Sequence, residues 1–327
     1  MGFRKIFFGH KNNKIQYYSV NYLRQLIPSK FFQNRRKIKL KILESLPKVD
    51  VEKILHRVNY YNQLENSVPL SSNAEKLSKV KLNKSSKVYF FDLYEYARFF
   101  NQQLKGHFLF GDITHVPNQP SLVKSRPVSS KNNNSVVLKW DKVRHFMFIK
   151  NDKKQFLQKK DKLVFRGKVF PNQIHRVAFL ETYSDHPMCD IGMTNENKLN
   201  PLWRVKRMTI DDHLDYKFIL SLEGNDVATN LKWVMSSNSI AVMPKPKFES
   251  WFMEGLLIPD YHYILIKDDY SDLSEKLEFY IKNPDKAVKI VENSKHYITQ
   301  FQNKNHEDII SLLVLEKYFK KTQQLLH

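Results

Sequence analysis

The sequence has little cysteine, little glycine and no long apolar run. A single cysteine, Cys189, in 327 residues excludes an internal disulfide and a cysteine-based zinc site. The 8 glycines and 13 prolines leave no segment with the composition of a flexible linker. No run approaches the roughly 18 apolar residues of a membrane-spanning helix, and charges interrupt the apolar N-terminus too often for a signal peptide. We therefore expect a globular protein of the reducing cytoplasm.

Several common catalytic motifs are also absent. The sequence contains neither G-x-G-x-x-G nor G-x-x-x-x-G-K-[ST], so a classical dinucleotide site and a P-loop lose support. It has no H-E-x-x-H motif, no G-x-S-x-G elbow and no D-x-D pair of the kind that clamps a divalent cation. If the protein acts on a diphosphate ester, we expect it to work without a bound metal.

The excess of positive charge lies in the first half of the chain. The net charge is +21; residues 1–150 hold 28 Lys/Arg and 9 Asp/Glu, whereas residues 151–327 hold 26 and 24. Codon bias in an AT-rich genome would add lysine to both halves, so the asymmetry favours an anionic partner for the first half, either nucleic acid or a membrane surface. A solvated basic face is the alternative. The 42% apolar content and the length predict a real core and two domains.

The two halves differ in their predicted elements. Apolar residues at near-helical spacing predict basic helices in the first 60 residues, followed by short strands and a helix rich in aromatics up to Phe100. The strands of this half are expected at residues 88–91, 107–113, 136–138 and 145–149. The second half alternates, with strands expected at residues 163–165, 218–222, 239–243 and 261–266. Its helices are expected after Gly224, from Asp272 with Glu275 in a capping box, from Pro284, and from about Glu307. The alternation predicts βαβ units and a parallel sheet.

Several segments occur in an order that matches one known family. They are Arg57–Asn62, Phe110–Ile113, Val123–Pro127, Arg144–Phe146, Lys159–Gly167, Tyr216–Lys217, Leu222–Asn230 and Pro259–Tyr263. Together they resemble glycosyltransferase family 90, which includes protein O-glucosyltransferases and bacterial lipopolysaccharide-modifying enzymes. The residues of these segments are more similar to those of the bacterial branch. The resemblance runs from about residue 55 to 300. It implies an α/β fold of the GT-B type, in which two Rossmann-like domains with parallel sheets face a central cleft.

The charged stretch at residues 153–162 predicts the domain boundary. We expect a basic acceptor and membrane-facing domain at residues 1–155 and a nucleotide-sugar donor domain at residues 156–300. The final helix, within residues 301–327, is expected to pack back on the first domain.

Asp112 is the predicted catalytic base. It follows an apolar strand-like run, and ligands of open α/β sheets bind at the carboxyl ends of strands. The resemblance implies that the acidic residue of this segment takes the proton of the acceptor hydroxyl. An aspartate that only caps a turn or a helix is the alternative.

The donor site is predicted around an arginine and a glycine turn. Arg166 would give the leaving diphosphate a charge-assisted bond, and the turn at Gly224 would present backbone N–H groups and a helix N-terminus. A surface ion pair and an ordinary turn are the alternatives. The full set of predicted donor residues is Arg166, Gly167, Arg176, Gly224, Asn225, Asp226, Val227, Ala228, Thr229, Asn230, Lys232 and Glu249. Eukaryotic members often have arginine where Asn230 stands, so Lys232 is the alternative phosphate contact, and Glu249 could instead be an exposed loop acid.

A second polar group is predicted beside the base. Lys124, Ser125 and Arg126 could contact donor sugar, diphosphate or a phosphorylated acceptor, or could form a structural ion pair. Tyrosines at 60, 61, 94 and 96 could stack on acceptor sugars, but their helical spacing favours core packing.

The resemblance implies an inverting, metal-independent transfer of a hexose, with glucose favoured, from a UDP-sugar to a hydroxyl of a lipopolysaccharide core or another surface glycan. No cofactor is expected besides the UDP-sugar co-substrate. The expected partners are the donor, the glycan acceptor and the anionic cytoplasmic face of the inner membrane, without nucleic acid. A protein O-glycosyltransferase and a basic nucleic-acid-binding protein are the alternatives.

Overall fold

The computed structural model describes residues 10–325, which form two compact units. Unit 1 comprises Arg144–Pro246 and Gly255–Gln300, with the described residues up to Asn12. Unit 2 comprises Asn13–Val143 and Lys247–Glu254, with the described residues from Phe301 onward. No helix among the described residues is long and apolar enough to cross a bilayer. Both units mix helices with parallel strands, which confirms the predicted α/β class, while the division into an acceptor and a donor domain stays a prediction.

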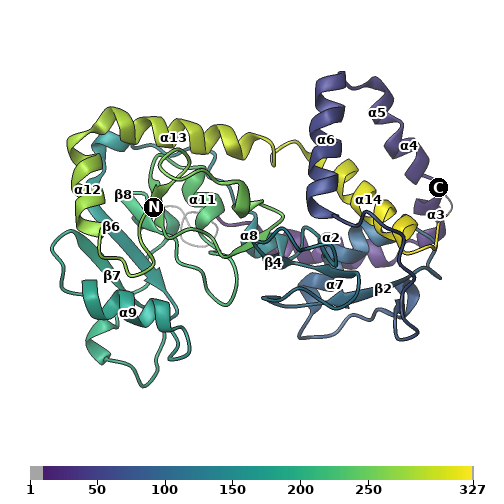
Figure 1. The fold of residues 1–327 in the computed structure, drawn as a ribbon, viewed down its shortest axis with the longest axis horizontal. Helices are drawn as coiled ribbons and strands as arrows, with labels where there is room; N and C mark the ends of the chain where they lie inside the picture. The colour runs from purple at the N-terminus through teal and green to yellow at the C-terminus, as the bar shows by residue number, and fades with distance from the viewer. Residues whose placement is uncertain (1–9, 326–327) are drawn as a thin grey trace. The chain divides into compact units, whose positions relative to one another are not determined.

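Unit 2 contains most of the helices near both ends of the chain. They are α2 (Lys14–Gln25), α3 (Ser29–Gln33), α4 (Arg36–Leu40), α5 (Ile42–Ser45), α6 (Lys48–Tyr61), α7 (Lys87–Ala97) and α14 (Lys304–Lys321), with a 3-10 turn at Leu77–Lys79 (Figure 1). The helix α14 packs against α6 and α7: Asn62 Nδ2 donates to the Val314 carbonyl at 3.2 Å, and Tyr96 Oη donates to Asp308 at 2.9 Å. The final helix is therefore part of the same unit as the first helices.

Two sheets complete unit 2. The larger one has the order β1 (Glu75–Lys76), β2 (Lys105–Leu109), β3 (Ser121–Val123), β5 (Ser135–Val137), and its last three strands are parallel. The smaller one pairs β4 (Ser125–Pro127) antiparallel with β10 (Phe248–Ser250). Because β2, β3 and β5 run the same way, the residues that follow them lie at one edge of the sheet.

Unit 1 is built on a five-stranded parallel sheet. Its order is β11 (Ile264–Leu265), β9 (Ile240–Met243), β8 (Tyr216–Leu220), β6 (Lys160–Gly167), β7 (Cys189–Met193). Its helices are α9 (Ile174–Tyr183), α10 (Ile210–His213), α11 (Leu231–Met235), α12 (Leu273–Lys282) and α13 (Pro284–Thr299), with 3-10 turns at Phe156–Gln158 and Pro201–Trp203. Two further short elements, α8 (Lys142–His145) and the 3-10 turn Glu254–Leu256, lie at the unit boundaries. The predicted βαβ alternation with a parallel sheet is confirmed.

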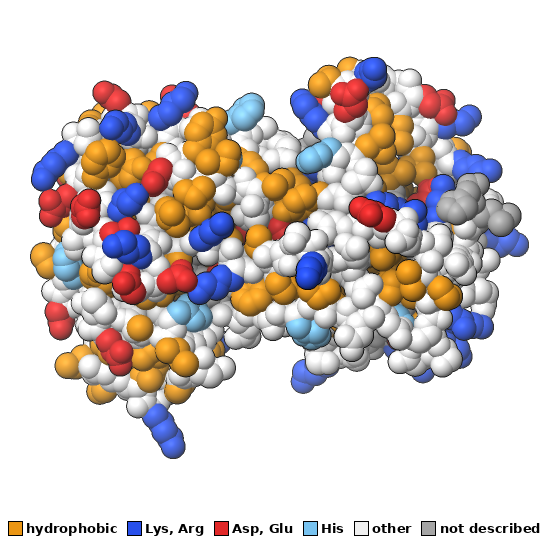
Figure 2. Space-filling view, viewed as in Figure 1, with side chains coloured by type: hydrophobic (Ala, Val, Ile, Leu, Met, Phe, Trp, Pro, Cys, Tyr) orange, Lys and Arg blue, Asp and Glu red, His pale blue; other side chains and the backbone are white. Residues whose placement is uncertain are grey.

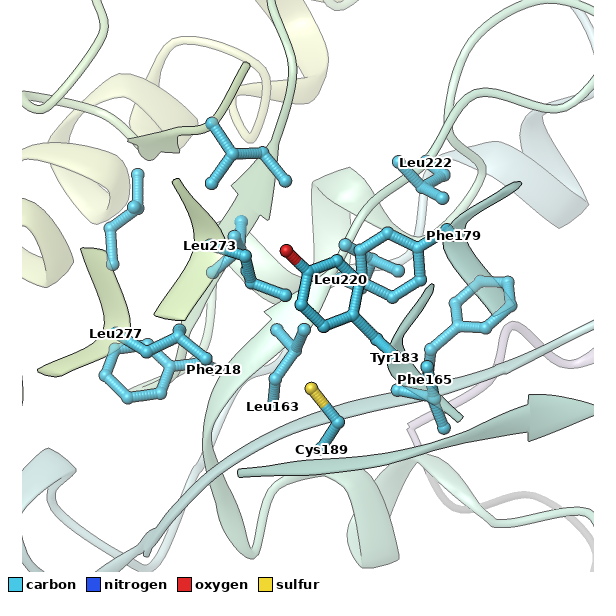
Figure 3. Close-up of a cluster of buried hydrophobic side chains, with 14 of the residues drawn as sticks. Leu163, Phe165, Phe179, Tyr183, Cys189, Phe218, Leu220, Leu222, Leu273 and Leu277 are labelled. Carbon is cyan, nitrogen blue, oxygen red and sulfur yellow. The ribbon is translucent and has the colours of Figure 1, made fainter. Parts of the chain in front are cut away.

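The core of unit 1 fills the space between the sheet and its helices (Figure 3). Leu163 and Phe218 of the central strands are fully buried, and Phe179 of α9 and Leu277 of α12 pack in the same cluster. A parallel sheet covered by helices on its faces is expected to have strands that are apolar on both sides, and all five residues of β8 are buried.

The strand order gives the place where a ligand is expected. The chain begins the sheet at β6, adds β7 on one side, and then crosses to the other side of β6 with β8, β9 and β11. In such doubly wound sheets the crevice lies at the carboxyl ends of the two strands where the direction of winding changes. Here those strands are β6 and β8, so the loops that follow Gly167 and Leu220 flank the expected crevice.

Several predicted elements are wrong. Residues 88–91 belong to helix α7 and not to a strand, because a short apolar run fits both periodicities and the neighbouring aromatics pack at helical spacing. Residues 145–149 form no strand, and the strand expected at 261–266 is reduced to β11. Asp272 precedes α12 without capping it, since its Oδ1 accepts from the Lys267 amide at 2.9 Å.

Candidate donor and acceptor sites

Asp112 lies at the carboxyl edge of the parallel sheet of unit 2. Strand β2 ends at Leu109, and Gly111 then has a φ of 115°, which a side chain would strain. A Cβ at this position would meet no atom within 4 Å, so glycine is needed for the backbone angle and not for space. The turn at Gly111 therefore decides where the carboxylate of Asp112 points.

Lys124 holds the Asp112 carboxylate by an ion pair. It follows β3, the strand next to β2, and its Nζ binds Asp112 Oδ1. The lysine side chain is 2% exposed, whereas the aspartate side chain is 27% exposed. The buried cation fixes the orientation of the carboxylate, which stays accessible to solvent. Ser125 Oγ donates to the carbonyl of Ile113 at 3.2 Å and so ties the two loops together.

A group of aromatic rings beside Asp112 was not predicted from the sequence. Phe110 stacks on Tyr89 at 5.6 Å between centroids and meets the edge of Trp140 at 5.1 Å. Trp140 follows β5 and is buried, and its indole N–H has no hydrogen-bond partner within the described residues. Phe110 and Tyr89 remain partly exposed. The position of Phe110, two residues before Asp112, is the sequence feature that could have indicated an aromatic ring near the carboxylate.

Arg126 and Glu249 form a buried pair within unit 2. They face each other across β4 and β10, and Arg126 Nε donates to Glu249 Oε1 at 2.7 Å. The other arginine nitrogens donate to the Tyr60 and Ser135 carbonyls, and Tyr60 Oη donates to the second oxygen of Glu249. Glu249 is 3% exposed, so the alternative of an exposed loop acid is wrong. Because both of its oxygens are engaged, this pair corresponds to the structural ion pair that the sequence left open, and a donor contact of Glu249 stays untested.

Arg166 is held by an acid of the neighbouring strand. It lies one residue before the end of β6, and its guanidinium pairs with the Asp190 carboxylate of β7 and donates to the Asp190 carbonyl at 2.7 Å. Tyr216 Oη donates to the second oxygen of the same carboxylate. Arg166 Nε is buried without a hydrogen-bond partner among the described residues. An ion pair was the alternative for this residue, and its contact with a phosphate stays a prediction.

Arg176 lies directly at the expected crevice of unit 1. It is in the first turn of α9, after β6, and donates to the carbonyls of Leu222 at 2.9 Å, Glu223 at 2.8 Å and Lys168 at 2.7 Å. The last two residues of this set follow β8 and β6, so the guanidinium joins the two crevice loops. A Cβ at Gly224 would lie 3.4 Å from Arg176 Nη2, an ordinary contact distance, so the guanidinium packs directly against this turn.

The charge of Arg176 is not compensated by a carboxylate in the part of the chain that the structure describes. Burial lowers the pKa of Arg176 to about 10, Tyr270 acts in the opposite direction, and Arg144 lowers it further. A partly buried cation that contacts only carbonyl oxygens is electrostatically suited to an anionic ligand. The adjacent His175 adds a second contact, since its Nε2 lies 2.8 Å from the Glu223 carbonyl.

The segment after Gly224 is folded differently from the prediction. The expected helix does not begin there: α11 begins at Leu231 and has 5 residues, so no helix N-terminus points at the turn. Val227, Ala228 and Lys232 are buried, and Asp226 is 3% exposed. Asn230 Nδ2 donates to the Leu220 carbonyl at 2.9 Å and so stabilises the end of β8. Of the residues predicted to bind the donor diphosphate, the structure brings Arg176 together with the backbone of residues 222–224.

No cluster of three or more His, Cys, Asp or Glu side chains that could hold a metal ion occurs within residues 10–325.

The comparison with known families identifies the class of this protein. The model described as glycosyl transferase family 90 matches residues 131–323, which is more than half of the chain. The chain therefore belongs to glycosyl transferase family 90 and is a glycosyltransferase, as the collinear segments predicted.

Individual relatives place it more narrowly within that family. The O-glucosyltransferase LpsA of Dichelobacter nodosus is 38% identical over 307 residues, which cover 94% of this chain and 95% of the relative. The human protein O-glucosyltransferase 3 is 24% identical over 172 residues, 51% of this chain and 33% of the relative. The similarity is thus greater to the bacterial branch than to the eukaryotic protein.

Proposed function

We propose that this protein transfers glucose from UDP-glucose to a hydroxyl of a lipopolysaccharide core, with inversion and without a metal ion. The observation that carries the proposal is the 38% identity to an O-glucosyltransferase named LpsA over 94% of the chain. The proposal includes the GT-B arrangement that the family resemblance implies and a place on the cytoplasmic face of the inner membrane.

On the acceptor side, Asp112 acts as the general base. Its carboxylate takes the proton of the acceptor hydroxyl while that oxygen forms a bond to the anomeric carbon of glucose. The ion pair with Lys124 orients the carboxylate before the acceptor binds. Phe110, two residues before Asp112, and Tyr89, which stacks on it, are partly exposed and offer ring faces on which the acceptor sugar can stack.

On the donor side, the leaving group is UDP, and its β-phosphate oxygen receives the electron pair of the broken glycosidic bond. Arg176 supports this step because it is a partly buried cation without a carboxylate partner in the described residues, at the strand ends where doubly wound sheets bind ligands. A guanidinium can bind the diphosphate through two parallel N–H bonds. Arg166 and Lys232 remain candidates for further phosphate contacts.

The experiment is a donor panel in the presence of EDTA. Purified protein is incubated with UDP-glucose, UDP-galactose, UDP-N-acetylglucosamine and GDP-mannose, and nucleotide release and thermal stabilisation are measured. We expect UDP-glucose to be hydrolysed and UDP to raise the Tm with EDTA present. No response to any UDP-sugar, or a response that requires added Mg²⁺ or Mn²⁺, would contradict the proposal.

A protein acceptor is the second candidate, and it is supported by the 24% identity to human protein O-glucosyltransferase 3. The two candidate functions are distinguished by supplying UDP-glucose with either lipopolysaccharide core or a folded serine-containing peptide and measuring which acceptor receives glucose. Transfer to the peptide alone would favour the second candidate.

A further inference from the structure

The first described helices of unit 2, from α2 to α5, carry an excess of positive charge, and Glu44 of α5 is their single acidic residue. Residues 13–43, from α2 to the second residue of α5, contain 8 Lys/Arg and no Asp or Glu. Two of the eight form ion pairs within unit 2: Arg24 with Glu95 and Lys39 with Asp308, each at 2.7 Å. The other six have no carboxylate partner in the described part of the chain; they are Lys14, Lys30, Arg35, Arg36, Lys37 and Lys41. Their charge is therefore available to an external anion.

The same segment exposes large apolar side chains. Leu26 is 77% exposed, Ile38 is 66% exposed and Leu23 is 61% exposed. Further exposed apolar residues of the segment are Ile15, Val20, Tyr22, Ile27, Phe31 and Ile42. Figure 2 shows hydrophobic and basic side chains, with a few acidic ones between them, over the region where α4, α5 and α6 lie in Figure 1. Isolated exposed apolar residues are common, but so many on one short segment indicate an interaction surface.

The helices α3, α4 and α5 have 5, 5 and 4 residues and contain no buried residue. They are attached to unit 2 by one side only. Phe32 packs against Phe99 at 5.4 Å between centroids, Arg98 lies 3.8 Å above the Phe32 ring, and Arg36 lies 4.7 Å above the Phe100 ring. These contacts hold the segment in place and leave its other side without a partner within the unit.

We propose that the segment from Leu23 to Ile42 docks on an anionic lipid surface, with its apolar side chains in the headgroup region and its lysines and arginines at the lipid phosphates. An amphipathic helical surface with apolar residues between basic ones binds membranes in this way. This inference deepens the membrane partner of the proposed function and rests on it.

The charge and the exposed apolar side chains of the segment favour an anionic membrane over a nucleic acid or a second copy of the chain. A nucleic acid would use the basic residues but would gain nothing from exposed Leu23, Leu26 and Ile38, because phosphate contacts dominate its binding. A second copy of the chain docked through the same surface would bring two uncompensated positive segments together. An anionic membrane is complementary to both the charge and the apolar side chains.

The test is co-sedimentation of the full-length protein with vesicles. We expect binding to vesicles of phosphatidylglycerol and phosphatidylcholine, weaker binding at high salt, and little binding to phosphatidylcholine alone. Replacing Lys30, Lys37 and Lys41 by Ser should lower the partition coefficient roughly fivefold per charge removed. The double variant Leu26→Ser, Lys37→Ser should lower it at least about tenfold.

The matched control is Lys198→Ser with Leu202→Ser, which also removes one exposed lysine and one exposed leucine but lies in unit 1, where Leu202 is 85% exposed. It should bind vesicles like the unchanged protein, and both double variants should keep the same Tm. The inference would be overturned if the control lost as much vesicle binding as the Leu26 variant, or if the protein bound neutral vesicles as well as anionic ones. A dimer that the Leu26 variant dissociates would also overturn it. Oligonucleotide binding that the lysine variants abolish and the vesicles do not compete with would overturn it too.

Failure of this inference is distinguishable from failure of the proposed function. Vesicle binding is measured without donor or acceptor, so it can persist in a protein that does not hydrolyse UDP-glucose. In the opposite case, UDP-glucose turnover without any vesicle binding would refute the docking surface alone.

Discussion

The assignment of Asp112 as base depends on a buried lysine beside an accessible carboxylate. Replacing Asp112 by Asn preserves the size of the side chain but removes the proton acceptor. We expect kcat to fall by about 10²–10⁴-fold. The Kd for UDP should stay within about twofold, because the phosphate contacts of the proposed function, Arg176 with Arg166 and Lys232, belong to unit 1.

The matched control for this variant is Asp161→Asn. Asp161 also pairs with a buried lysine, Lys217, but lies at the beginning of β6 in unit 1. It should keep normal turnover. Near-normal kcat in the Asp112 variant, or an equal loss in both variants, would remove the assignment.

Arg176 gives the second prediction at the level of single residues. Lysine keeps the charge but loses the planar fork that contacts three carbonyls and, in our proposal, the diphosphate. We expect Arg176→Lys to weaken UDP binding about tenfold to a hundredfold by calorimetry. The exposed Arg204, which pairs with Glu196, provides the control Arg204→Lys, which should bind UDP normally. Unchanged affinity in the Arg176 variant would place the diphosphate elsewhere.

At the scale of elements, one buried carboxylate of α14, Glu307, contributes charged contacts that hold this helix in unit 2. Glu307 pairs with Arg57 at 2.6 Å and Lys139 at 2.6 Å, and Trp251 Nε1 donates to it at 2.8 Å. Burial alone would raise the pKa of Glu307, but the charges of Lys139 and Arg57 and the hydrogen bonds of Lys139 and Trp251 lower it below its ordinary value. The stabilisation is therefore complete above the ordinary value of 4.5 and is lost as the pH falls through the lower folded value.

Replacing Glu307 by Gln leaves two buried cations without their carboxylate. We expect the free energy of unfolding at neutral pH to fall by about 3–5 kcal/mol, and the difference from the unchanged protein to shrink below pH 4.5. Urea denaturation at both pH values measures this. Glu316→Gln, which removes an ion pair with Lys320 on the same helix, should cost less than about 0.5 kcal/mol. A pH-independent difference for Glu307 would show that its charge is not the cause.

The elements that could be predicted are those with a strong local signal. The strand before Gly167, the helix from Pro284 and the last helix were expected close to where they lie, because their apolar periodicity is long or their caps are clear. Residues 88–91 could not be assigned, since four apolar residues do not distinguish a strand from a buried helical turn. The helix expected at Gly224 begins at Leu231, because the polar loop carries no cap that fixes its start.

The candidate sites were predictable to a different degree. Asp112 and Lys124 were both singled out, and the parallel pairing of β2 with β3 explains why they meet. The pairing of Arg126 with Glu249 joins residues 123 positions apart across an antiparallel sheet, which no local pattern reveals. Arg176 was suggested by family resemblance alone, and its three carbonyl partners depend on how β6 and β8 are ordered in the sheet.

At the scale of the whole molecule, the charge asymmetry, the βαβ alternation of the second half and the collinear family segments all agree with a glycosyltransferase. Residues from Phe301 onward group with the first part of the chain, and so do residues 247–254, whose return to that unit was not predicted. The return of such a short segment cannot be recognised from composition, because its contacts are long-range.

The most direct measurement of the central claim is mass spectrometry of a lipopolysaccharide core acceptor after incubation with this protein, EDTA and UDP-glucose labelled with ¹³C in the sugar. The account predicts that the acceptor gains one labelled hexose, that the new anomeric configuration is opposite to that of the donor, and that Asp112→Asn abolishes the gain. An acceptor of unchanged mass while UDP-glucose is consumed, or a product that retains the donor configuration, would contradict it.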